Sequence, residues 1–516
     1  MQRYSILWAD DEIELLKPHI LFLTKKGYDI TAVNSGRDAL DKCQEENFDL
    51  IFLDENMPGM TGLETLSQIK AFKPHIPVVM ITKSEEEYIM EEAIGAKIAD
   101  YLIKPLNPNQ ILLSAKKILD SKSLITEKTN RNYQQDFRNI SMAFNDKMDH
   151  ESWIEVYKKL VFWELEIENT ENQSMAEVLN MQKEEANASF AKFIGENYES
   201  WLNDENVSSP VLSHNLLYEK VFPLLADEPL FFILIDNLRY DQWKVLAPII
   251  SEYFNIAEES LYYSILPTTT AFARNSIFAG MMPSDIADEI PEMWVGDDDE
   301  GSKNNFEKEL LQAQLDELDL PVKMSYNKII QATQGKAIVD NFNNLLHNHL
   351  NVIVYNFVDM LSHARTDTTM IRELAPDEAA YRSLTKSWFL HSPLLDMLKK
   401  IAEKKLKVVI TTDHGTIRTK RPYKIIGDKN TNSNLRYKQG KNLAYDRKNV
   451  IIANQPEKFC LPKSNLSSTY VFATEDYFFA YPNNYNHYVK YYRDTFQHGG
   501  LSLEEMIIPI VVLEPK

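Results

Sequence analysis

The stretch Val-Val-Ile-Thr-Thr-Asp-His-Gly, residues 408–415, places an aspartate and a histidine directly after a short apolar run. Apolar and β-branched residues predict a buried strand, and the glycine ends it. In an open α/β sheet, ligands bind at the carboxyl ends of the strands. Asp413 and His414 therefore stand where one oxygen and one nitrogen ligand can hold a divalent metal. The alternative is an aspartate that caps a helix, followed by a histidine in a loop.

Other apolar runs in the last 300 residues also lead to potential ligands. These ligands are Asp236 after 229–235, Thr270 after 262–266, Asp359 after 351–358 with His363 four residues on, and His498 before the final run 506–512. Because the carboxyl ends of parallel strands meet at one rim of a sheet, we expect these side chains to converge there.

The ligands sort into two sets. One set is Asp236, Asp413 and His414, with Thr270 as the bridging group, and the other is Asp359, His363 and His498. Mixed histidine and aspartate ligands suit Zn²⁺, with Mn²⁺ as the alternative. Two metals about 4 Å apart clamp the attacking and leaving oxygens of a phosphoryl transfer. A threonine hydroxyl on such a metal loses its proton more easily and becomes the nucleophile.

The order Asp…Thr…Asp-x-x-x-His…Asp-His…His-Gly resembles the PglZ branch of the alkaline phosphatase superfamily over most of 220–516. The resemblance implies Thr270 as the nucleophile, because residues 267–270 match the Pro-Thr-x-Thr form of the phosphodiesterase branches; Thr269 is the rival. A sulfatase is excluded, because Cys460-Leu-Pro-Lys lacks the required arginine and follows the ligands that it should precede.

The first 120 residues alternate short apolar runs with amphipathic stretches, which predicts a flavodoxin-like parallel sheet with helices on both faces. The polar groups that follow these runs are Asp10 and Asp11 after 5–9, Asp54 after 50–53, Thr82 after 78–81 and Lys104 after 101–103. Three carboxylates on one rim make a Mg²⁺ site, and Asp54 can accept a phosphoryl group. Thr82 and Lys104 would then bind the phosphoryl oxygens.

This whole segment resembles the receiver domain of two-component response regulators. The resemblance implies Asp54 as phosphoacceptor, Mg²⁺ on Asp10, Asp11 and the carbonyl of Asn56, and Tyr101 as the switch aromatic. It also implies a sensor histidine kinase as partner. The alternative is an ordinary flavodoxin-like domain whose strand-end acids are solvated.

The region between the two α/β segments is charged and poor in glycine, with aromatic residues at helical spacing, which predicts a helical bundle. We therefore expect three domains: a phosphoacceptor domain at 1–120, a helical bundle at 121–215 and an alkaline-phosphatase-like α/β domain at 216–516. No helix-turn-helix signature follows the first domain, so a DNA-binding output is not supported.

The chain carries 55 basic and 76 acidic residues in 516, a net charge of −21 that argues against non-specific binding of duplex DNA. Only Cys43 and Cys460 occur, which favours a reducing cytoplasm over a disulfide framework. No apolar run approaches the roughly 18 residues that a membrane span needs.

Residues 418–441 invert this charge, with eight basic residues and one acid, Asp428. Because the segment follows the metal ligands, we expect an electrostatic funnel in which Arg418, Lys420 and Arg421 bind phosphates and two tyrosines, Tyr423 and Tyr437, stack on bases. A solvated loop and a docking patch for an acidic partner are the alternatives.

A receiver, a helical middle and a PglZ domain in one chain resemble the PorX type of response regulator, which serves type IX secretion. The resemblance implies zinc-dependent hydrolysis of cyclic and linear oligonucleotides, with a secretion-machinery or sigma-factor partner. Both signs of charge between 85 and 120 favour a homodimer on phosphorylation. The alternative function is a phosphorylation-controlled adaptor whose zinc site only stabilises the fold.

Overall fold

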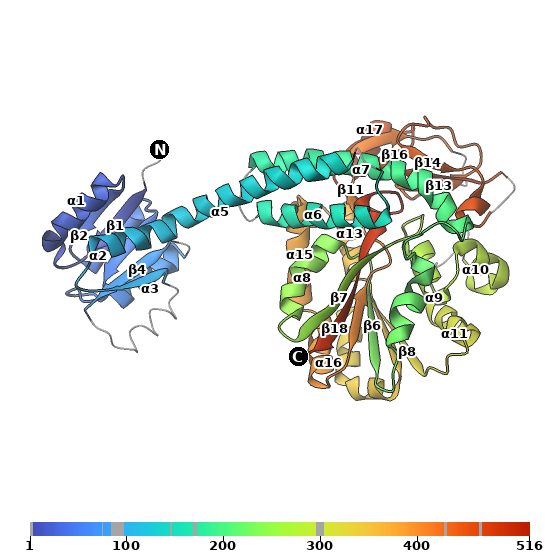
Figure 1. Cartoon of the computed structure of the whole chain (residues 1–516), viewed down its shortest axis with the longest axis horizontal. Coiled ribbons are helices and arrows are strands. Elements are labelled where there is room, and N and C mark those ends of the chain that lie inside the picture. The colour runs from blue at the N-terminus through green and yellow to red at the C-terminus, as the bar shows by residue number, and fades with distance from the viewer. Residues whose placement is uncertain are drawn as a thin grey trace. The chain divides into compact units, whose positions relative to one another are not determined.

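The computed structural model describes residues 4–74, 76–83, 98–144, 147–168, 173–295, 304–427, 431–463 and 467–516. Two compact units divide the chain, Met1–Gln135 and Asp136–Lys516, and each is described by itself. The long helix α5 (Pro108–Ala143) begins in the first unit and ends in the second (Figure 1). Within the described residues, no helix is both long enough and apolar enough to cross a membrane.

The first unit is built on a five-stranded parallel sheet. Its strand order is β2 (Asp29–Val33), β1 (Ser5–Ala9), β3 (Leu50–Asp54), β4 (Val78–Thr82) and β5 (Asp100–Ile103). Within the described residues, its α-helices are α1 (Lys17–Lys25), α2 (Gly36–Glu45), α3 (Gly62–Phe72) and the start of α5. Separate apolar clusters cover the two faces of the sheet. The predicted receiver fold is confirmed.

Two long helices, α6 (His150–Glu168) and α7 (Gln173–Asn203), lie near the start of the second unit. Their aromatic residues pack against each other, for example Trp153 on Phe190 with ring centroids 5.3 Å apart. These aromatic residues also pack on the large sheet, where the ring centroids of Trp201 and Tyr263 are 5.6 Å apart. The helical middle region is confirmed, and most of its aromatic residues are core, although Phe162 is exposed.

A six-stranded mixed sheet forms the centre of the second unit. Its order is β7 (Phe254–Tyr263), β18 (Ile507–Pro515), β10 (Val408–Thr411), β6 (Leu230–Ile235), β9 (Leu350–Tyr355) and β8 (Met324–Ile329). Only β18 runs antiparallel to its neighbours, so the other five strands share one direction. Helices α9 (Asn275–Ala279) and α11 (Glu307–Glu317) lie on one side, and α8 (Tyr240–Ile250), α15 (Glu378–Leu390) and α16 (Pro393–Glu403) on the other (Figure 1).

Some strand bounds differ from the sequence-based expectation. The run expected to be a strand at 351–358 ends at Tyr355, and Asp359 lies in the helix α13 (Phe357–Asp367). Strand β7 begins at Phe254 rather than at 262, because an edge strand tolerates the exposed polar residues that precede Leu261. Strand β8 was not predicted, since its side chains are half-buried and do not form an apolar run.

Candidate metal centres and phosphoacceptor site

The first candidate metal centre lies at the carboxyl ends of β6 and β10. Leu234 pairs with Thr411 across these parallel strands, and Asp236 and Asp413 each follow two residues later. His414 Nε2 lies 3.7 Å from Asp236 Oδ1 and 3.8 Å from Asp413 Oδ2. All three side chains are buried, with ligand atoms close enough to share one ion. The predicted first set therefore comes together.

Thr270 stands against this group. It begins the one-turn helix η5 (Thr270–Arg274), and its Oγ1 is 3.1 Å from His414 Nε2 and 3.4 Å from Asp236 Oδ1. The rival hydroxyl of Thr269 is buried without a hydrogen-bond partner in the described part of the chain. The geometry thus favours Thr270 over Thr269 as the group that can react at this centre.

The second candidate centre comprises Asp359, His363 and His498. Asp359 Oδ2 is 3.4 Å from His363 Nε2, one turn along α13, and Asp359 Oδ1 is 3.4 Å from His498 Nε2. The His498 ring stacks on His414 with centroids 4.3 Å apart, so the two centres are adjacent. His363 is 59% exposed, which leaves the second centre open to solvent on that side.

Burial controls the protonation of this pair of centres. Burial and the neighbouring His414 lower the pKa of His498 to about 3, which keeps its ring neutral and able to bind a metal. Burial opposes ionisation of Asp413, but the Arg274 guanidinium holds the pKa of this carboxyl below its usual value. Both groups therefore rest in the form that a metal requires.

Arg274 is a site residue that the sequence reasoning missed. It is fully buried, with Nε 2.9 Å from Asp413 Oδ2, Nη1 3.3 Å from Glu307 Oε1, and Nη2 in contact with Asp236. It fixes both carboxylates while their other edges face Thr270 and His414. The available signal was its spacing, since Arg274 follows Thr270 by one helical turn.

Asn237 links the two centres and was also missed. Its backbone lies in the left-handed region, with φ of 64°, which asparagine tolerates. The turn lets Nδ2 donate to Asp359 Oδ1 at 3.2 Å, while the backbone N–H donates to Asp413 Oδ1 at 3.4 Å.

Gly415 follows His414 at a position where no side chain fits. An added Cβ would lie 1.9 Å from the carbonyl oxygen of Glu504.

The acidic site of the first unit forms as expected from Asp10, Asp11 and Asp54. Lys104 Nζ lies 2.8 Å from Asp10 Oδ2 and 3.0 Å from Asp54 Oδ1. Burial raises the pKa of Asp54, and Lys104 opposes that rise. This carboxylate donor set fits Mg²⁺.

The switch residues of the first unit lie close by. Burial raises the pKa of Tyr101, and a hydrogen bond with Thr82 opposes this shift, so the two side chains are in contact. Asn56, the expected carbonyl ligand, is exposed two residues after the phosphoacceptor position.

The basic segment differs from its expected form. Its described residues build strands β11 (Ile417–Arg418), β12 (Arg421–Lys424) and β13 (Tyr437–Gly440); Asp428 lies outside the described residues. Tyr423 and Tyr437 are buried, so the prediction that they stack on bases is wrong for this structure.

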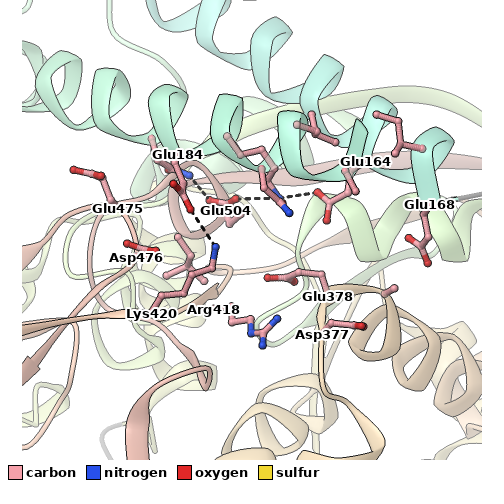
Figure 2. A pocket seen from close by; sticks show the side chains of 18 of the residues that line it. Glu164, Glu168, Glu184, Asp377, Glu378, Arg418, Lys420, Glu475, Asp476 and Glu504 are labelled. Atoms are coloured by element: carbon pink, nitrogen blue, oxygen red, sulfur yellow. Dashed lines mark hydrogen bonds and ion pairs between the residues drawn. The ribbon is translucent and has the colours of Figure 1, made fainter. Parts of the chain in front are cut away.

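Acidic partners hold the three basic side chains predicted to bind substrate. Arg418 Nη2 is 3.1 Å from Asp494, Lys420 Nζ is 3.3 Å from Glu184, and Arg421 Nη2 is 2.7 Å from Glu475. They line a cavity of about 320 Å³ with eight acidic and five basic side chains, which disfavours a phosphate chain (Figure 2). Their role in substrate binding stays a prediction.

Comparisons with known proteins agree with this organisation. Residues 6–116 match the response regulator receiver domain, 123–202 the PorX response regulator linker domain, and 216–513 the BREX system PglZ alkaline phosphatase-like domain. The last match covers more than half of the chain.

Individual relatives match over about a quarter of the chain. The transcriptional regulatory protein ZraR of Escherichia coli K12 is 37% identical over 22% of this chain and 26% of its own length. ResD of Bacillus subtilis is 35% identical over 22% of this chain and 48% of its own length. The solved structure of CheY4 of Vibrio cholerae, at 29% identity, covers 23% of this chain and 100% of that one, with a TM-score of 0.22.

The chain thus spans between about a quarter and a half of the length of these curated relatives. With its receiver, its linker domain and its alkaline phosphatase-like PglZ output domain, the chain belongs to the PorX-type response regulators.

Proposed function

We propose that the PglZ domain is a zinc-dependent phosphodiesterase for cyclic and linear oligonucleotides, which phosphorylation at Asp54 activates in the control of type IX secretion. The observation that carries the proposal is the Thr270 hydroxyl against Asp236 and His414, beside the adjacent group of Asp359, His363 and His498. Oligonucleotides and type IX secretion are inferred from the resemblance to PorX-type regulators.

The donor set fits two zinc ions. Each group combines carboxylate oxygens with imidazole nitrogen, which is the ligand chemistry of zinc in hydrolases. Bound zinc would lower the pKa of the Thr270 hydroxyl and stabilise negative charge on the phosphoryl oxygens. Thr270 Oγ1 would attack phosphorus and displace an alkoxide, and water would later release the second product and restore the threonine.

The charges around the centres support a diester substrate. A phosphomonoester brings an additional negative charge, which a free cation would have to balance. All three guanidinium nitrogens of Arg274 already pair with carboxylates, those of Asp413, Asp236 and Glu307. Asn237, whose side-chain amide donates to Asp359 and whose backbone N–H donates to Asp413, adds no charge where it links the two centres. A diester, which carries one charge, therefore suits the site better.

Elemental analysis of the full chain is expected to give close to two zinc ions per molecule. Asp359→Ala should remove one of them and abolish diester turnover, because Asp359 is the only carboxylate of its group. Asp340→Ala, at an exposed helix end, is the matched control and should change neither quantity. Full zinc content and full activity in Asp359→Ala would exclude the second centre.

Phosphorylation is expected to change the oligomeric state. Of the charged residues behind this expectation, Glu85–Glu87, Glu91, Glu92 and Lys97 lie outside the described residues, whereas Lys116 and Lys117 are exposed on α5. Beryllofluoride, which mimics the phosphoryl group on Asp54, should double the mass measured by light scattering. Asp54→Ala is the control, and an unchanged mass in the wild type would contradict dimerisation.

A further inference from the structure

The helix α17 (Tyr485–Tyr492) has the sequence Tyr-Asn-His-Tyr-Val-Lys-Tyr-Tyr, and none of its side chains is buried. Its aromatic rings are exposed or half-buried, and they pair with helical spacing. The His487 and Tyr491 rings stack with centroids 6.3 Å apart, and Tyr488 stacks with Tyr492 at 6.1 Å. Aromatic rings at such a density ordinarily face a core, so their display at the surface indicates a binding role.

Several contacts connect α17 to α13, the helix that carries Asp359 and His363. Thr366 lies three residues beyond His363 on α13, about 4.5 Å along the helix axis. Its carbonyl oxygen accepts a hydrogen bond from Arg372 Nη2 at 2.6 Å, and that guanidinium lies 5.5 Å from the ring centroid of Tyr491. Its hydroxyl accepts from Gln497 Nε2 at 3.2 Å, next to His498.

Basic groups are interleaved with the rings. Arg372, Lys490 and Arg493 surround the helix, and Lys490 and Arg493 are exposed. Two acids, Glu373 and Asp494, lie in the same segments, and Asp494 is paired with Arg418. In a chain of net charge −21, this face combines cations with stacked aromatic rings. That combination is the mode by which proteins bind single-stranded nucleic acid without reading its sequence.

We propose that α17 is the stacking platform for the bases of a single-stranded oligonucleotide whose scissile diester lies at the metal centres. The proposal rests on the proposed phosphodiesterase function and names the part of the substrate that the chain recognises outside the reacting group. It moves base stacking from Tyr423 and Tyr437, which are buried, to Tyr488 and Tyr491 on α17.

The test measures binding of a fluorescent single-stranded oligonucleotide to the zinc-loaded full chain carrying Thr270→Ala, which prevents turnover. Adding Tyr488→Ala and Tyr491→Ala should weaken binding about 5-fold or more, since a lost base stack has at least that effect. Tyr488→Phe with Tyr491→Phe should restore the affinity, because stacking requires the ring and not the hydroxyl. Tyr218→Ala, at a tyrosine that is 61% exposed elsewhere, is the matched control.

In chains that retain Thr270, the same alanine pair should lower kcat/KM for the oligonucleotide relative to that for bis-p-nitrophenyl phosphate by a similar factor. Wild-type affinity in the alanine pair overturns the proposal, and so does a loss of binding in Lys420→Glu with Arg421→Glu alone, which would assign binding to the basic segment. If the wild type hydrolyses neither diester, the proposed function fails, whatever the binding data show.

Discussion

Thr270→Ala is expected to lower turnover of bis-p-nitrophenyl phosphate on the order of 10³-fold or more, because it removes the proposed nucleophile. The Thr270 hydroxyl is the one that contacts His414 and Asp236. Release of p-nitrophenolate measures the rate, with and without a chelator. In the wild type, the diester should also react faster than p-nitrophenyl phosphate, because Arg274 is committed to carboxylates.

Thr269→Ala provides the control for Thr270→Ala. Its hydroxyl has no hydrogen-bond partner in the described part of the chain, so the variant should keep turnover within about 10-fold of the wild type. A large loss in Thr269→Ala with little loss in Thr270→Ala would reassign the nucleophile. Normal secretion in cells that carry only the Thr270→Ala chain would instead favour the adaptor alternative.

Arg382→Met is expected to lower the free energy of unfolding of the second unit by about 3–5 kcal/mol, the cost of removing one partner from a buried ion pair. Arg382 is 4% exposed, and its Nη1 lies 2.8 Å from Glu164 Oε1 and 2.9 Å from Asp241 Oδ2. Chemical denaturation measures the loss. Lys420→Met removes an exposed partner of Glu184 and should cost at most about 1 kcal/mol. Equal losses of unfolding free energy in the two variants would contradict the larger contribution expected of the buried Arg382 ion pairs.

The pH dependence of stability provides a second measurement on the same variant. Burial would raise the pKa of Glu164, but Lys183 and Arg382 lower it from 4.5 to about 2. A carboxyl with a lowered folded-state pKa stabilises the fold above its unfolded pKa and loses that contribution as the pH falls. Wild-type stability should therefore decline between about pH 4.5 and pH 2, and the Glu164 part of that decline should be smaller in Arg382→Met.

Most of the candidate metal ligands could be predicted from the sequence, because they follow a buried strand, as Asp236 and Asp413 do, or lie on the helix after one, as Asp359 does. Apolar runs such as that before Asp236 are local signals, and parallel pairing brings their ends together. Arg274 gave no comparable signal, because its role depends on carboxylates that reach it from three other elements.

The basic segment shows the opposite error. Its eight basic residues predict an exposed loop, because the acids that pair with Arg418, Lys420 and Arg421 lie 54 to 236 positions away in the sequence. Charge pairing over such separations leaves no local pattern. The tyrosines of α17 carry a local signal, because their sequence predicts a helix with many aromatic and few aliphatic residues.

The buried ion pairs around Arg382 have a consequence for how the molecule responds to its ionic surroundings. They run from Glu164 on α6, through Arg382 and Asp241, to Arg239, three residues after Asp236. Dissolved salt weakens exposed charge pairs strongly and buried ones far less. The attachment of α6 to the segment after β6 is therefore nearly independent of ionic strength, whereas the proposed attraction of a nucleic acid to α17 should fall as salt rises.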